Sequence, residues 1–398
     1  RMTSLAQTTK TFAKIGCLSF GGPAAQIALM HRELVDRTGW LSEKQFLSGL
    51  SFCMLLPGPE AMQLATYAGW RLHGTIGGLI AGALFVIPGA LVVMALATIY
   101  ALFGDVPLVE TVFLGIKAAV LAIVLEALVK VAKRAFKTTL HWVLAALSFI
   151  ALFMFNLPFP LVIAVAAFVG YLTTSAGAVG QAPPSVPWGK TLRTITVWLA
   201  IWWVPIGLLA LVAPDGFLLQ IAVFFSKLAT VTFGGAYAVL AYMGQEVVTG
   251  FGWLSAGQMI DALGLAETTP GPLILVTEFV GFLAGYAEGG IKLAILAALV
   301  TLWVTFIPCF LWIFAGAPYI EWISDQPKLS GALSAITAAV VGVIANLSIW
   351  FGLHVLFDRV DRVQFGWMPD VSSVNWLAVV LGALCVVLIL RLKMNILW

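Results

Sequence analysis

Residues 12–59 read FAKIGCLSFGGPAAQIALMHRELVDRTGWLSEKQFLSGLSFCMLLPGP, and residues 225–272 read FSKLATVTFGGAYAVLAYMGQEVVTGFGWLSAGQMIDALGLAETTPGP. With a constant offset of 213 residues and no gap, about 18 of these 48 positions are identical. The shared positions include both FGG triplets, both GWLS tetrads and both PGP triplets. Such a match within one chain indicates an internal duplication, so the protein consists of two related halves.

The duplication continues beyond these two stretches. After a further shift of about seven residues, VIP at 86–88 matches FIP at 306–308, and the triplet AAV recurs in the same register. The repeat unit is therefore a whole half of the chain. We expect a first repeat over residues 1–172, a linker rich in Pro, Gly and Ser over 173–192, and a second repeat over 193–398.

The composition is typical of a membrane protein. Apolar residues make up 61% of the chain, charged residues make up 10%, and the mean hydropathy is +1.03; in soluble domains about a quarter of residues are charged. A bilayer crossing takes roughly 20 apolar helical residues. The long apolar stretches are 74–103, 108–131, 193–213, 291–315, 330–356 and 374–396, with 141–154 and 158–172 as a shorter hairpin. Because these runs are uniformly apolar rather than alternating, we predict an all-α polytopic membrane protein.

Several other classes of protein are excluded by the same features. Basic residues lie at predicted helix ends rather than in one patch, so we expect no nucleic-acid partner. The cysteines and histidines lack metal-ligand or axial-ligand spacing, and no GxGxxG motif follows a strand, so we expect no metal, no other cofactor and no enzyme. The first ten residues contain no apolar signal segment, so insertion through the chain's own helices is expected.

The basic loops predict how the two repeats are oriented. Segment 130–137 carries four basic residues and is expected in the cytoplasm, whereas segment 104–110 carries only two acidic residues. Counting crossings from these segments places the N-terminus inside and the start of the second repeat outside. Segment 31–44 is rich in basic residues, whereas the matching segment 244–257 has no Lys or Arg. We therefore predict inverted repeats in a multi-pass protein of the cell (inner) membrane.

Both repeats contain two helix breaks at matched positions. A Gly pair before Pro suits a helix end followed by a new helix, and the PGP triplets follow the same logic. Exposed N–H groups at helix starts attract anions. Glycines that permit packing and prolines that kink helices would be the simpler explanation, but the repetition favours an anion site near the bilayer midplane. The residues assigned to it are Gly21, Gly22, Pro23, Pro57, Gly58, Pro59, Gly234, Gly235, Pro270 and Gly271.

The path of the chain at these breaks has two solutions. Each pair of segments forms either a re-entrant hairpin or one broken helix that spans the bilayer. Hairpins keep Arg32, Arg37 and Lys44 inside, as the basic-loop rule prefers, whereas spanning helices would place these cations outside.

Three lysines are candidates for attracting an anion. Lys14 and Lys227 lie seven residues before the FGG triplets, and they either pair with Glu33 and Glu246 or form an electropositive approach to the site. Lys117 has no carboxylate three or four residues away in its predicted helix. An intramembrane cation without a local partner indicates a cavity or an ion path.

Neutral donors accompany these cations. Thr268 and Thr269 stand just before the second PGP triplet, where their hydroxyls can donate hydrogen bonds to an oxyanion. Gln26 and Gln63 each lie on the helix that leaves a break, and they are either anion donors or interhelical hydrogen-bonding groups.

Carboxylates near the breaks are candidates for proton coupling. Glu60 follows the first PGP triplet, where the helix dipole alone would also stabilise it. Glu267 precedes the second triplet, and Glu278 has no basic residue three or four positions away. Glu126 has Lys130 four residues on, so a surface ion pair is expected there.

Five segments resemble the signature of the chromate ion transporter family: FAKIGCLSFGGP at 12–23, Glu33, GWLSEKQF at 39–46, LLPGPEAMQLATYAGWRLHG at 55–74 and FVIPG at 85–89. The resemblance covers both halves, as in the long two-domain form of that family. In the second half FGGA replaces FGGP, and ETTPGPL replaces LPGPE. The two halves therefore differ at the residues that would meet a substrate.

The resemblance implies a secondary transporter, an antiporter that exports the tetrahedral dianion chromate with the proton gradient and confers chromate resistance. The residues themselves do not separate chromate from sulfate, or a coupled carrier from a uniporter or channel. The expected partners are the anion and the lipid bilayer, and the existence of a homo-oligomer is left open.

Replacing Lys117 with Ala tests its assignment as an anion attractor. We expect gradient-driven flux of radiolabelled chromate into proteoliposomes to fall at least about tenfold, the effect of losing ~1.4 kcal/mol of anion binding. Unchanged flux in the folded variant would contradict the assignment. Flux of the unmodified protein that ignores the imposed pH gradient would instead favour a uniporter.

Overall fold

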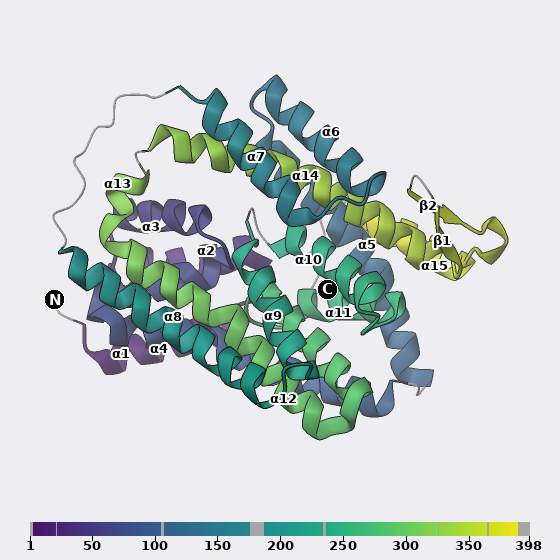
Figure 1. Ribbon diagram of the computed structural model, residues 1–398, viewed down its shortest axis with the longest axis horizontal. Helices are drawn as coiled ribbons and strands as arrows, with labels where there is room; N and C mark the ends of the chain where they lie inside the picture. Colours follow the sequence, from purple (N-terminus) through teal and green to yellow (C-terminus); the bar gives the residue numbers. More distant parts are fainter. Residues whose placement is uncertain are drawn as a thin grey trace. The chain divides into compact units, whose positions relative to one another are not determined.

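The computed structural model describes residues 3–20, 22–104, 107–175, 187–233, 236–324, 326–363 and 366–388. Within these ranges the chain is helical apart from one antiparallel pair of strands, which confirms the predicted all-α class (Figure 1). The segments Glu60–Phe103, Trp188–Val212, Leu273–Tyr319 and Pro327–Leu356 are long and apolar enough to cross a bilayer. The protein is therefore a multi-pass membrane protein.

The chain forms two compact units, and each unit combines segments of both repeats. Unit 1 contains Arg1–Ala101, Ala178–Gly235 and Ala266–Gln326. Unit 2 contains Leu102–Gly177, Ala236–Leu265 and Pro327–Trp398. The repeat and linker boundaries expected from the sequence stay a prediction.

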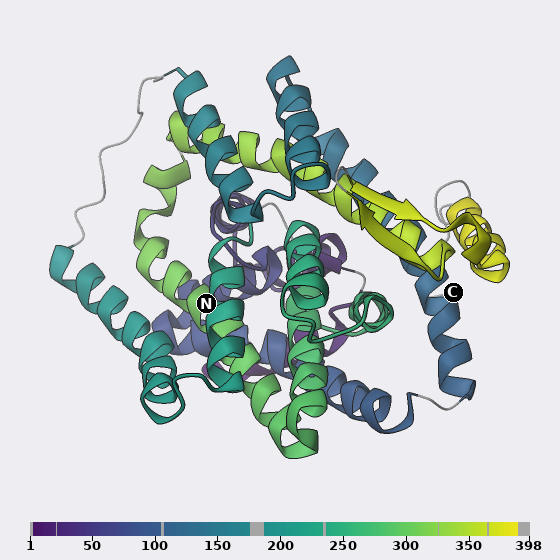
Figure 2. The same ribbon diagram turned by 45° about the vertical axis from the view of Figure 1, so that its right-hand side comes forward.

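Unit 1 holds the first four helices of the chain and the matching long helix of the second half. Its elements are α1 (Leu5–Leu18), α2 (Gly22–His31), the π-helix η1 (Arg32–Arg37), α3 (Glu43–Leu55), α4 (Glu60–Phe103), α8 (Trp188–Val212), α9 (Phe217–Thr230), η3 (Leu273–Leu275), α12 (Val276–Gly316), η4 (Ala317–Tyr319) and α13 (Ile320–Ser324). Helices α8 and α9 both pack along α12 (Figures 1 and 2).

Unit 2 is centred on α14 (Pro327–Leu356), which packs against the helices α5 (Pro107–Ala135), α6 (Thr139–Phe153) and α7 (Phe159–Thr173). Its other elements are α10 (Ala236–Gln245), the π-helix η2 (Glu246–Gly250), α11 (Ala256–Thr268), β1 (Val360–Val363), β2 (Gly366–Pro369), η5 (Val371–Ser373) and α15 (Trp376–Val386). Small residues permit the close packing: a Cβ on Gly342 would lie 2.1 Å from the Ala145 carbonyl oxygen. The expected pair of Glu126 and Lys130 on α5 is confirmed at 2.7 Å.

The two strands form an antiparallel pair. Val360 pairs with Pro369 and Val363 with Gly366 in this ladder. The β-branched and aromatic residues at Val360, Val363 and Trp367 were the available signal for strands.

The two repeats share their local structure in detail. Serines 42 and 255 each form a capping box with the glutamine three residues later, at the start of α3 and α11. The glycines before them, Gly39 and Gly252, have φ values of 61° and 67°. Each π-helix follows the helix that leaves the FGG break. The sequence duplication is thus a structural duplication, whereas the inverted orientation stays a prediction.

The long elements α4 and α12 each fold back on themselves. The backbone leaves the helical region at Gly74, with φ 63°, and at Gly290, with φ 73°. A Cβ on Gly69 would lie 2.2 Å from the Gly77 carbonyl oxygen, so the arms before and after the turn run antiparallel in contact. The apolar stretches expected to cross the bilayer, 74–103 and 291–315, correspond to the second arms.

Membrane orientation can be tested with one exposed cysteine in each repeat. Asp36→Cys and Thr249→Cys occupy matched, exposed positions in the two π-helices. In a chain without its natural cysteines, a membrane-impermeant maleimide added to intact cells should label Thr249→Cys and leave Asp36→Cys unlabelled until the membrane is opened. Labelling of both variants from one side would contradict inverted repeats.

Candidate functional site

The helix breaks have the backbone geometry that their sequences predict. Helix α1 ends at Leu18, and α2 begins at Gly22, whose φ is 77°. The middle glycines of the PGP turns, Gly58 and Gly271, have φ values of 123° and 91°. These left-handed conformations favour glycine because it has no Cβ. All of these breaks belong to unit 1.

Each PGP turn is hydrogen-bonded to the helix break of the other repeat. The Gly271 N–H donates to the Ser19 carbonyl at 2.8 Å, and the Gly58 N–H donates to the Thr232 carbonyl at 2.8 Å. Ser19 and Thr232 are matched positions, as are Gly58 and Gly271. The two bonds are therefore equivalent, and we call each of these bonds between the repeats an exchange. They occupy the amides of Gly58 and Gly271, which the sequence analysis assigned to anion binding.

The second arms of the long hairpins pack on the same turns. A Cβ on Gly89 of α4 would lie 2.3 Å from the Pro270 carbonyl oxygen, and a Cβ on Gly58 would lie 3.0 Å from Cys309 Sγ of α12. Gly89 and Cys309 each follow the repeated Ile-Pro pair. Sequence reasoning used that pair as a marker of duplication and missed its contact with the PGP turns.

The first repeat forms two hairpins rather than broken spanning helices. Lys14 Nζ lies 2.8 Å from Glu33 Oε1, so the ion pair, one of the two alternatives for this lysine, is formed. Along a straight helix these residues would be about 28 Å apart, so the chain must fold back between them. In the second hairpin, a Cβ on Gly49 of α3 would lie 2.2 Å from Tyr67 Cε1 of α4.

Polar side chains differ between the two exchanges. Buried Gln26 donates through Nε2 to the carbonyls of Gly271 at 2.6 Å and Ser19 at 3.3 Å, while its matched position in the second repeat is Val239. Gln63 donates through Nε2 to the Pro57 carbonyl at 2.7 Å. Gln26 thus bridges the two repeats, and both amides hold irregular backbone in place.

Glu278 is the most unusual of the predicted site residues. It lies in the first turn of α12, just after the second PGP turn, and its side chain is 0% exposed. Within the described part of the chain, neither carboxyl oxygen has a hydrogen-bond partner. Aligning the turns at Gly74 and Gly290 places Met62 at the matched position of the first repeat. This carboxyl group is therefore specific to one half of the protein.

The remaining predicted residues are less informative. Buried Thr269 donates to the Ala266 carbonyl at 3.3 Å, Thr268 is exposed, and Glu60 and Glu267 are half-buried. Lys227 is exposed in the last turn of α9. Gly21, Gly234, Gly235 and the side chain of Lys117 on α5 lie outside the described residues. The assignment of these residues to anion binding or proton coupling stays a prediction.

The sequence of the chain is similar to known transport proteins over most of its length. The sequence profile of the family described as "Chromate transporter" matches residues 6–171 and 219–398. A probable chromate transport protein of Synechococcus elongatus is 33% identical over 89% of this chain and 86% of its own length. Chromate transport proteins of Cupriavidus metallidurans and Pseudomonas aeruginosa are each 30% identical, over 89% and 91% of this chain and 84% of their own length. No solved structure shows a significant match.

Substituting Gly89 tests the close approach of α4 to the second PGP turn. Gly89→Ala would force a methyl group against backbone at Pro270, so we expect a loss of about 1–3 kcal/mol of stability and loss of transport. Gly207→Ala in α8 is the matched control, because no described atom lies within 4 Å of its added Cβ. Thermal unfolding in detergent measures the stability of both variants, and chromate flux in proteoliposomes measures their transport. Equal melting temperatures of the two variants would contradict the contact.

Proposed function

Because the chain belongs to the chromate transporter family, we propose that it exports chromate across the cell (inner) membrane in exchange for protons and thereby confers chromate resistance. The family consists of transporters rather than enzymes.

Anion binding is supported by the helix starts of unit 1. Helices α2 and α4 begin at the breaks, at Gly22 and Glu60, where the first-turn N–H groups lack partners within a helix. These helix starts carry partial positive charge, which stabilises an oxyanion. Among the described atoms none lies within 4 Å of a Cβ placed on Gly22, so a ligand can approach this helix start closely.

Proton coupling is carried by one observation, the burial of Glu278 without a hydrogen-bond partner among the described residues. A carboxylate in apolar surroundings without a partner costs several kcal/mol, so this group is stable there only when it binds a proton. Exchange requires the transporter to return with a proton after it has released the anion. A buried Glu278 that holds a proton can carry this proton on the return step.

Direct transport measurements test the exchange. Glu278→Gln keeps the shape of the protonated acid but cannot release a proton. One pH unit supplies ~1.4 kcal/mol per proton, or about a tenfold concentration ratio. We expect proteoliposomes loaded with labelled chromate and placed in acidic medium to export it faster than at equal pH, and Glu278→Gln to lose this acceleration while still exchanging chromate for chromate.

The control is Glu126→Gln, which removes a carboxylate that is already paired with Lys130. This variant should keep the pH response of the unmodified protein. A full response in Glu278→Gln would remove that residue from the mechanism and leave Glu60 and Glu267, tested by the same substitution. Equal inhibition by unlabelled sulfate and chromate would indicate a general oxyanion carrier instead.

A further inference from the structure

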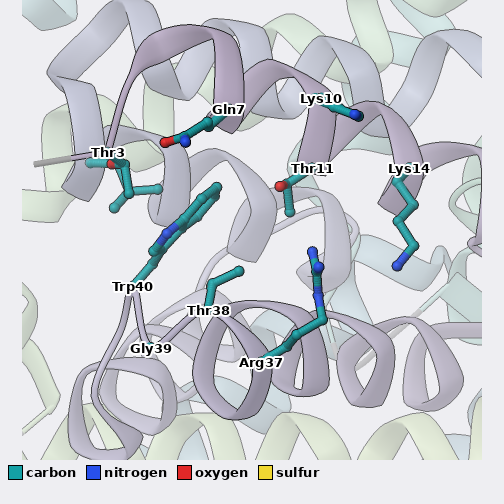
Figure 3. A pocket seen from close by; sticks show the side chains of 10 residues that line it. Thr3, Gln7, Lys10, Thr11, Lys14, Arg37, Thr38, Gly39 and Trp40 are labelled. Carbon is teal, nitrogen blue, oxygen red and sulfur yellow. The ribbon is translucent and has the colours of Figure 1, made fainter. Parts of the chain in front are cut away.

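A pocket lies between α1 and the end of η1 with the residues that follow it, at the end of the first hairpin that is distant from the helix break (Figure 3). Its cavity volume is about 1070 Å³. The residues used below are Lys10, Thr11 and Lys14 on one wall and Arg37, Thr38 and Trp40 on the other. All of them belong to unit 1.

The pocket carries a net charge of +2. Three cations line it, and one carboxylate behind it, Glu33, is shared by Lys14 at 2.8 Å and Arg37 at 2.7 Å. The hydrogen bond from Lys14 lowers the pKa of Glu33, so this carboxylate is ionised at neutral pH. Lys10 has no acidic partner within the part of the chain that the structure describes. The excess charge is equal and opposite to that of a tetrahedral dianion.

The polar wall on α1 leads toward the helix break. Gln7, Lys10, Thr11 and Lys14 follow the spacing of one helical face. Lys14 is five residues from Ser19, a rise of about 7.5 Å, and the Ser19 carbonyl is bonded to the second PGP turn. This polar face of α1 therefore extends from the pocket part of the way toward the candidate site.

The second repeat has lost most of this charge. At the matched positions, Val223 replaces Lys10 and Phe224 replaces Thr11. Gly250 replaces Arg37, and Phe251 replaces Thr38. Lys227 and Trp253 match Lys14 and Trp40, and Gln220 and Gly252 match the lining residues Gln7 and Gly39. The matched positions of the second repeat thus carry one cation, Lys227, where the pocket of the first repeat has three.

We propose that this pocket is a one-sided capture site for a free tetrahedral oxyanion, which makes the transporter load from the face of the first repeat. The inference rests on the proposed function, and it supplies the direction: with the first repeat facing the cytoplasm, loading from this face is export. Positive potential at such an opening raises the local concentration of the anion.

The lining favours a free oxyanion over a lipid headgroup. Leu72 is the one aliphatic side chain among the lining residues, and hydroxyl, amide and cationic groups make up most of the rest. A bound lipid would need an apolar groove for its acyl chains as well as a cationic site for its phosphate. The lining supplies the cationic site, whereas Leu72 is the one aliphatic side chain in it that could contact an acyl chain.

Lys10→Gln is the direct test, because Lys10 is exposed and its loss leaves the Lys14–Glu33–Arg37 cluster intact. In proteoliposomes the KM for chromate presented to the first-repeat face should rise about threefold to tenfold at low salt, with kcat unchanged, and the difference should vanish at high salt. The KM from the opposite face should not change.

Lys190→Gln is the matched control, because it removes one exposed lysine outside the pocket, on the face predicted to be the same. An equal effect of the two variants, or an equal change from both faces, would overturn the proposal. So would a Lys10→Gln effect that appears only in liposomes with anionic lipid, which would assign the pocket to a headgroup.

Direct binding separates this inference from the proposed function. Isothermal titration of the detergent-solubilised protein with sulfate, a dianion of the same shape, should give weaker binding to Lys10→Gln than to the unmodified protein. If the unmodified protein binds sulfate in this way but moves no chromate, the pocket stands and the transport proposal fails. Equal sulfate binding in both proteins overturns the pocket.

Discussion

Backbone polar groups inside a membrane protein must find partners within the protein, because the hydrocarbon offers none. The helix breaks at Ser19 and Thr232 interrupt regular hydrogen bonding, and the PGP turn of the opposite repeat supplies the missing donor in each case. Leaving such a group unpaired in an apolar medium costs several kcal/mol. The two bonds therefore tie each break to the PGP turn of the other repeat, and both of them lie within unit 1.

The exchange sets the requirements for several side chains around it. Gly58 and Gly271 must adopt positive φ to present their amides, and Gly89 must lack a Cβ because the Pro270 carbonyl lies against it. Beyond these positions the two halves are free to diverge. Gln26 donates to the Ser19 and Gly271 carbonyls, and its matched position in the second repeat is Val239. Glu278, just after the second PGP turn, is matched by Met62, and Cys309 is matched by Gly89. A symmetric scaffold thus holds an asymmetric set of polar groups.

That asymmetry suits directional transport. In the proposed mechanism the exposed cations of the first hairpin attract the anion through solvent, where each interaction is weak and easily reversed. Glu278 is buried, so a change of one proton there has a large energetic effect. The proposal thus assigns weak capture to one face and a strong switch to the interior, and this separation would let the protein bind its substrate without trapping it.

The sequence by itself determined the duplication, the all-α membrane class, the positions of the helix breaks and the pair Glu126–Lys130, and it offered the pair Lys14–Glu33 as one of two alternatives. These features are readable because apolar run length, glycine and proline placement and residue spacing act locally or recur in both halves. Only the tertiary structure showed that each PGP turn bonds to the opposite break, that Glu278 lacks a partner among the described residues and that the first hairpin encloses a cationic pocket. Each of these depends on residues brought together from different elements, some more than 170 positions apart, and no local pattern encodes such packing.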